Sequence, residues 1–313
     1  MLVYTIRRVL MAIPVMGIVA AIVFSLLYLT PGDPALVLAG DHATPENIAR
    51  LRTALGLDQP PHLRFMTWLW QVLRGDLGAS IFSGETVTHM IGQRLEATFS
   101  LLVYAVVISI TVGVPFGVLA AARRGGLADR LLTSYSTLGF SVPAFVAGYG
   151  LAFIFATTLK WLPVQGYSPL ADGFVPFLRT LTLPAVTLSL VYSALIGRIT
   201  RASMLEVLSE DYIRTAKAKG IAPWRILFRH ALQNAAVPVV TIIGIGIATL
   251  IGSAVITENV FAIPGIGRLT VDAVLHRDYP VIQGVVLLLS AGYVLVNLAV
   301  DLFYTLLDPR IRY

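Results

Sequence analysis

Residues 97–122 read ATFSLLVYAVVISITVGVPFGVLAAA and carry no charged side chain. At a rise of about 1.5 Å per residue, a helix of this length crosses the roughly 30 Å hydrocarbon core of a bilayer. Helices that cover the core of a soluble domain interrupt their apolar positions with polar ones at helical spacing. The stretch therefore predicts a transmembrane helix.

Further uncharged runs repeat this pattern along the chain, at 9–32, 131–159, 180–197, a stretch ending at 257, and 279–300. The composition agrees, with 57% apolar and 13% charged side chains and a mean hydropathy of +0.80. The first run is longer than the core of a signal peptide, and no A-x-A-like site follows it. The run at 180–197 is the shortest and contains Pro184. We expect an all-α integral membrane protein with about six transmembrane helices.

The basic residues between the runs predict the orientation. If the amino terminus is cytoplasmic, the short outer loops hold only Lys160, Arg179, Arg268 and Arg277. Because Lys and Arg concentrate in short cytoplasmic loops, we expect both termini in the cytoplasm.

The segment 33–96 would then lie outside the cell and form helices that start near Pro45 and after Pro60. Trp68 and Trp70 suit a membrane interface, so we interpret this segment as a helical cap on the outer leaflet rather than a ligand site.

Several classes of function are disfavoured by the same residues. The absence of cysteine excludes thiolate chemistry and Cys-ligated metals, and the dispersed basic residues form no nucleic-acid stripe. No H-E-x-x-H spacing that would indicate a metal enzyme occurs, and no G-x-x-x-x-G-K-[ST] loop that would bind the phosphates of ATP occurs. A membrane-embedded serine protease is disfavoured because no histidine lies in a firmly assigned span, where it could activate Ser141. An ion-coupled secondary transporter usually needs mid-membrane carboxylates or broken helices. Asp301 and Glu258 lie near the ends of spans, and we interpret both as structural.

The cytoplasmic loop at about 198–234 carries most of the functional information. Asp211 is placed to cap a helix, Lys217 and Lys219 suit its carboxyl end, and Gly220 can adopt the left-handed conformation that closes it. A second short helix is expected from Pro223, with an apolar side that begins at Trp224. Such a helix suits either the groove of a soluble partner or the surface of anionic lipid.

Short motifs in a fixed order give the loop a context: TPGDP at 30–34, GLD at 56–58, GDLG at 75–78, SVP at 141–143, DYIRTAKAKG at 211–220, ENVF at 258–261, PGIG at 264–267 and LDPRIRY at 307–313. In these motifs the chain resembles the permeases of binding-protein-dependent ABC importers, within the dipeptide, oligopeptide and nickel branch. Its loop departs from the family's EAA motif, because the three positions aligned on Gly220 read Arg214-Thr215-Ala216 and Pro238 lies further along than usual.

The resemblance implies a type I ABC importer-like transmembrane domain in the bacterial inner membrane. The chain would be no enzyme and would hold no cofactor, since ATP and Mg would bind to two separate ATP-binding subunits. A second homologous permease and an extracytoplasmic solute-binding protein would complete the importer. Peptides are the expected solute, with nickel, glutathione or another small solute as alternatives.

The resemblance also assigns segments of this chain: a first transmembrane helix at 1–32, an extracytoplasmic segment at 33–96 and a core permease domain at 97–313. The binding protein would dock on the outer segment and on residues 258–280, where PGIG forms either a re-entrant stretch or an ordinary loop. The ATPase would contact a coupling loop in which Trp224 is the hydrophobic anchor and Lys217 is a further candidate, and its residues would be Arg214, Thr215, Ala216, Gly220, Ile221, Pro223, Trp224, Leu227 and Phe228.

Overall fold

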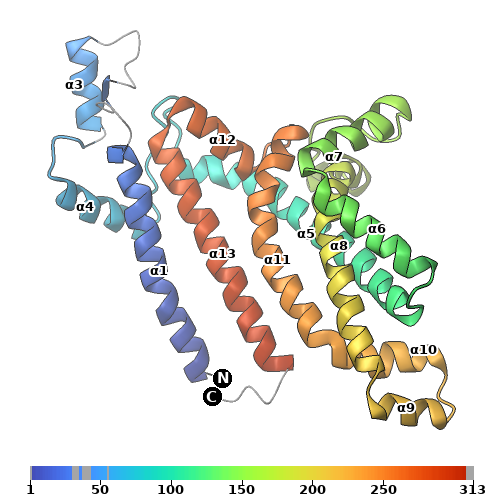
Figure 1. Cartoon of the computed structure of the whole chain (residues 1–313). Coiled ribbons are helices and arrows are strands. Elements are labelled where there is room, and N and C mark those ends of the chain that lie inside the picture. Colours follow the sequence, from blue (N-terminus) through green and yellow to red (C-terminus); the bar gives the residue numbers. More distant parts are fainter. Residues whose placement is uncertain (1, 30–34, 37–43, 55, 308–313) are drawn as a thin grey trace. The chain divides into compact units, whose positions relative to one another are not determined.

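The computed structural model describes residues 2–29, 35–36, 44–54 and 56–307, and helices make up most of them (Figure 1). The motifs at 30–34 and 308–313 lie outside the described residues. The chain divides into unit 1, with Glu96–Arg268 and Leu295–Tyr313, and unit 2, with Leu2–Leu95 and Leu269–Val294.

The helices are α1 (Leu2–Leu29), α3 (Pro45–Ala54), α4 (Pro61–Leu73), α5 (Val87–Ala122), α6 (Leu127–Ser141), α7 (Ala144–Leu151), η2 (Ala152–Thr158), η3 (Leu170–Asp172), α8 (Phe174–Leu208), α9 (Asp211–Ala218), α10 (Pro223–Arg225), η4 (Ile226–Ala231), α11 (Leu232–Val260), α12 (Ile266–His276) and α13 (Tyr279–Leu307).

The expectation of about six spans is confirmed. Within the described residues, five helical stretches are long and apolar enough to cross a membrane: Ile6–Leu29, Val87–Ala122, Phe174–Leu208, Pro223–Val260 and Tyr279–Leu302. The helix α6, together with α7 and η2, passes the same test but is bent by 107° at a short break, and it brings the number of spans to six when the bent pair counts as one span. The fold is that of a multi-span helical membrane protein.

Two of the predicted spans differ in shape from the expectation. The run at 131–159 is not one straight helix, because α6 ends before Val142, whose backbone is extended, and α7 follows Pro143. Proline disfavours a helical conformation in the residue before it and donates no backbone hydrogen bond. The run at 180–197 is not short either, since it lies inside the longer helix α8, which continues through Pro184.

Unit 2 joins α4 to the span α1 through aromatic contacts. The ring centroid of Phe24 lies 5.2 Å from that of Phe65 and 5.5 Å from that of Trp68. The Arg64 guanidinium donates a 2.9 Å hydrogen bond to the Tyr28 hydroxyl. The sequence correctly predicted α3 and α4, and these contacts hold α4 against one end of α1.

Unit 1 is built around α8, whose side chains are buried by neighbouring helices on several sides. The segment of α5 in this unit approaches α8 very closely at Gly113 and Gly117. A Cβ atom on Gly117 would lie 2.6 Å from the Gly197 carbonyl oxygen, so a larger residue could not fit there. Paired small residues at this spacing let two membrane helices pack backbone to backbone. Glycine in α5 thus sets the position of α8, which leads into the predicted coupling loop.

Candidate functional site

The helix α9 ends in the glycine turn that the sequence predicted. Gly220 has φ +72°, its N–H donates to the Lys217 carbonyl at 3.0 Å, and the Ile221 N–H donates to the Ala216 carbonyl at 3.2 Å. These two bonds form a Schellman motif, which satisfies carbonyl groups left open at the end of a helix. The prediction for the start was wrong by one residue, because Glu210 and not Asp211 occupies the N-cap position.

The second helix of the loop is not a separate short helix. After Pro223, α10, η4 and α11 follow one another without a break, so that Pro223–Val260 forms one long helical span. The segment η4 is a π-helical stretch within it. The expectation of an isolated helix failed because Pro223 starts a helix at its first turn, and this helix continues through Pro238 to Val260. The coupling-loop residues from Pro223 onward therefore belong to the same continuous helix as a membrane span.

Apolar side chains attach this region to the spans of unit 1, and we call this group the inner cluster. It brings together residues from α5, α8, α9, η4 and α11, with Ile221 and Leu227 packed at its edge: Val118, Ala121, Met204, Ile213, Ala216, Ile226, Ala231 and Ala235. Ala216 and Leu227 therefore face the chain's own interior to a large extent. Packing inside this chain is therefore enough to explain why these two positions are apolar, and no contact with a partner protein is needed.

The opposite side of the region exposes the other predicted residues. Trp224 is 61% exposed and Phe228 is 50% exposed, one helical turn apart. Arg214, Thr215, Gly220 and Pro223 are exposed as well, and Ile221 is half-buried. Figure 1 shows α9 and α10 together at one end of α8.

Several basic residues stand close in sequence to the two exposed aromatic residues. The Arg225 guanidinium lies 5.2 Å from the centroid of the Trp224 ring, and Lys217, Lys219 and Arg229 are exposed nearby in sequence. Large aromatic side chains and arginine are the residue types that most often dominate binding at protein interfaces. We call the surface made by Trp224, Phe228 and these cations the inner face, and its chemistry suits an acidic surface with an apolar pocket.

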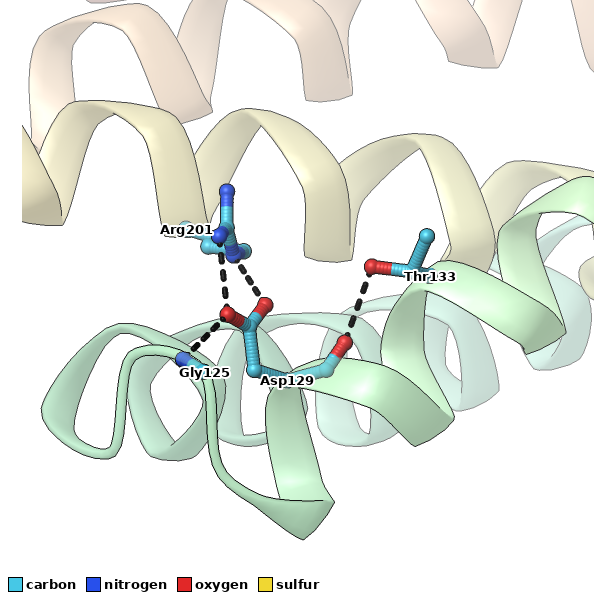
Figure 2. A network of polar contacts seen from close by, with 4 residues as sticks. All are labelled: Gly125, Asp129, Thr133 and Arg201. Carbon is cyan, nitrogen blue, oxygen red and sulfur yellow. Dashed lines mark hydrogen bonds and ion pairs between the residues drawn. The ribbon is translucent and has the colours of Figure 1, made fainter.

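An ion pair that the sequence did not predict ties the start of α6 to α8 (Figure 2). The Asp129 carboxylate accepts from both Nε and Nη2 of Arg201, the latter at 2.9 Å, and from the Gly125 N–H at 2.8 Å. The Thr133 hydroxyl donates to the Asp129 carbonyl at 2.9 Å. The only sequence signal was that both residues lie within one helical turn of an uncharged run, 131–159 for Asp129 and 180–197 for Arg201.

The outer end of α11 holds a buried carboxylate. Glu258 is 0% exposed, and its Oε1 accepts a 2.6 Å hydrogen bond from the Thr98 hydroxyl while Oε2 accepts a 3.0 Å bond from the Arg268 N–H. A Cβ atom on Gly265 would lie 2.2 Å from the Glu258 carboxyl carbon. The PGIG motif is therefore a tight turn that leads into α12 and fits around this carboxylate. The geometry agrees with a structural role for Glu258.

Comparison with known proteins shows to which family the chain belongs. Residues 113–313 match the model of the binding-protein-dependent transport system inner membrane component, and residues 1–102 match the model of its N-terminal region. A probable peptide ABC transporter permease of Sinorhizobium fredii is 56% identical over 99% of both chains. A putative peptide transport system permease of Brucella abortus is 45% identical over 98% of both.

Two further comparisons concern a relative that is named for another solute and a solved structure that shares the fold. A glutathione transport system permease of Salmonella typhimurium is 42% identical over 100% of both chains. A chain of the MetNI methionine ABC transporter has the same fold, with a TM-score of 0.59 at 18% identity over 70% of this chain and 96% of that one. This chain therefore belongs to the family of binding-protein-dependent transport system inner membrane components, as a multi-pass permease of an ABC importer.

Proposed function

We propose that this permease imports peptides as one of two homologous permease subunits, each providing half of the pathway. Two separate subunits bind ATP with Mg and hydrolyse it, and an extracytoplasmic protein delivers the solute. The relatives that are 56% and 45% identical are named as peptide permeases, which supports peptides as the solute. The relative at 42% identity is named for glutathione, itself a modified tripeptide, so it agrees with a short peptide backbone as the shared chemistry.

The inner face is the single feature that best supports an ATPase as partner. Trp224 and Phe228 are exposed on a helix that stays continuous through Val260. The inner cluster fastens the same helix to α5, α8 and α9. A partner that grips the two aromatic side chains would move a rigid helix, and the motion would pass directly into a span. Arg214 and Lys217 would bind acidic groups of the partner beside its contact with these two aromatic side chains.

The test is affinity purification of the full chain from its native membrane in mild detergent, with mass spectrometry of what co-purifies. We expect two ATP-binding subunits and a second permease with the wild-type chain. Trp224→Asp should lose the ATP-binding subunits and keep the second permease, because it places a carboxylate in the partner's apolar pocket. Trp161→Asp is the matched control, since Trp161 is 62% exposed but lies in a loop far along the chain from the inner face.

Two results would contradict the proposal. If Trp224→Asp retains the ATP-binding subunits as well as Trp161→Asp does, the inner face is not their docking site. If the wild-type chain is recovered alone under conditions that preserve other importers, and uptake by membrane vesicles depends on a proton gradient and not on ATP, the ion-coupled transporter is the correct class.

A further inference from the structure

The exposed side of α6 is divided into two sectors along its length. Leu127, Leu131 and Leu138 form a sector that is apolar apart from the exposed Ser134 among them. Thr133, Thr137 and Ser141 follow one another at four-residue spacing and form a second, exposed sector that is polar. A helix that only faced lipid would have no reason to keep these two kinds of side chain apart. The division indicates that α6 meets two different environments.

The three hydroxyl groups alone do not identify the second environment. Each donates to the carbonyl four residues earlier, at 2.9 Å for Thr133, 2.9 Å for Thr137 and 2.8 Å for Ser141. This back-bonding satisfies the donor and makes a hydroxyl tolerable in lipid. It also leaves each oxygen free to accept a hydrogen bond from water. Another side chain beside the polar sector is needed to tell whether this sector faces lipid or water.

Arg198 on α8 is that group. A pocket of about 360 Å³ lies between α6 and α8, with Thr133 and Thr137 on one side and Arg198 and Ala202 on the other. Arg198 is exposed, and its guanidinium lies 5.1 Å from the centroid of the Phe140 ring on α6. Within the part of the chain that the structure describes, it forms no ion pair with a carboxylate.

The neighbouring arginine differs in this respect. Arg201 also lines the pocket, but its charge is balanced by Asp129, whose carboxylate is fully engaged by Arg201 and the Gly125 N–H (Figure 2). The net positive charge of the pocket therefore belongs to Arg198. Arg198 directly follows the uncharged run 180–197, so its guanidinium lies at the cytoplasmic end of the span, where an uncompensated charge is costly against lipid and faces water instead.

We propose that Thr133, Thr137 and Arg198 form part of the water-filled wall of the translocation pathway, and that Arg198 is a binding station for a carboxylate of the passing solute. The identity of the solute as a peptide rests on the proposed function, because every unmodified peptide ends in a carboxylate. A guanidinium binds a carboxylate through two parallel hydrogen bonds. The Thr133 and Thr137 oxygens can accept from the N–H groups of a peptide at the same place.

The station is built for weak binding, as transport requires. Binding in a pathway has to be favourable enough for entry and weak enough for release. Arg198 is exposed at the cytoplasmic end of its span, so water competes for its hydrogen bonds and screens its charge. The site would thus guide an anionic end group through the pathway without trapping it.

The first experiment measures water access in the assembled transporter, in native membrane vesicles. Because the chain contains no cysteine, a single introduced thiol is the only one in this subunit. We expect Thr137→Cys to react with a water-soluble maleimide at least about tenfold faster than Leu138→Cys, since only a hydrated thiol ionises and reacts. Leu138 is the matched control, as the next residue on the same exposed side of α6. Equal and slow reaction of both variants would overturn the proposal.

The second experiment measures the charge of the station. In Thr137→Cys, we compare the reaction rates of a negatively and a positively charged methanethiosulfonate of similar size. Adding Arg198→Gln should lower the ratio of the two rates by about threefold or more, because a unit charge several ångströms away acts oppositely on the two reagents. Arg198→Lys keeps the charge and should keep the ratio. An unchanged ratio in Arg198→Gln would reject Arg198 as the station.

Neither experiment depends on ATP or on the identity of the solute. If the purified chain lacks ATP-binding subunits but Thr137→Cys is hydrated and sensitive to Arg198→Gln, the proposed function fails and the pathway assignment stands. If the subunits co-purify while Thr137→Cys reacts no faster than Leu138→Cys, the proposed function stands and the pathway assignment fails.

Discussion

The two ends of α11 and its helical extension are held in opposite ways. At the outer end, the buried Glu258 carboxylate accepts directed hydrogen bonds from Thr98 and from the backbone of the first turn of α12. At the inner end, the start of the same long helix is held by apolar side chains of the inner cluster, while Trp224 stays exposed. One end is fixed by polar geometry and the other by packing.

The difference shows which end is built to move. A buried hydrogen-bond network has a narrow range of allowed distances, and a broken bond leaves a buried polar group unpaired. Apolar side chains have no directed bonds, so packed helices can slide by small shear displacements. The outer turn should therefore act as a fixed pivot, and the inner face should follow a partner. The following predictions test this contrast, beginning with the largest effect.

Glu258→Ala should destabilise the outer end most strongly. It removes the acceptor for the Thr98 hydroxyl and for the N–H groups of Gly267 and Arg268. A buried donor left unpaired costs about 1–3 kcal/mol, so the three together cost about 3–9 kcal/mol. The midpoint of thermal unfolding of the detergent-purified chain should fall sharply. Glu258→Gln keeps an acceptor, so its unfolding midpoint should fall less than that of Glu258→Ala. Equal falls of the midpoint in both variants would show that the charge and not the hydrogen bonding is required.

Ile213→Ala should weaken the inner end by a smaller amount. Ile213 is completely buried in the inner cluster, and shortening a buried Ile to Ala costs about 2–5 kcal/mol. We expect less recovery of ATP-binding subunits in affinity purification, with the second permease retained. Leu127→Ala is the control, because Leu127 is exposed. An Ile213→Ala chain that loses the second permease first would show that the inner cluster supports the spans rather than the inner face.

The number of spans followed from the sequence, but the break in one of them did not. The pair Val142-Pro143 separates α6 from α7, whereas Val114-Pro115 lies inside the continuous helix α5. The two dipeptides are identical, so local propensity has no means to tell them apart. Whether a proline bends a helix or breaks it depends on what packs around the freed backbone groups, and that is decided by the tertiary structure.

The candidate site shows the same limit. Gly220 was predicted because its left-handed conformation is a local property. The ion pair of Asp129 with Arg201 joins residues 72 positions apart, and the bond of Thr98 to Glu258 joins residues 160 apart. Ala216 is buried for the same reason, since the residues that cover it come from distant helices. Sequence patterns placed the loop but did not separate its supporting residues from its exposed ones.

Gly220→Ala should produce a modest effect confined to the inner end. No atom lies within 4 Å of an added Cβ, so the only cost is the left-handed backbone at φ +72°. That cost is about 1–2 kcal/mol for a residue with a side chain. We expect a small drop in the unfolding midpoint and a clear drop in ATP hydrolysis stimulated by the solute-binding protein. Gly220→Asn should behave closer to wild type, because Asn tolerates this conformation better.

Asp211→Ala should have the smallest effect of all. Its 3.1 Å ion pair with Arg214 is formed by two highly exposed side chains, and such pairs contribute little because water screens them. The unfolding midpoint should stay unchanged. The substitution nevertheless frees the exposed Arg214 guanidinium for the acidic groups proposed to bind beside the inner face, so binding to an acidic partner should be maintained or strengthened when recovery is measured against salt concentration. If recovery falls instead while stability stays the same, Asp211 itself contacts the partner, and the inner face is recognised through both signs of charge.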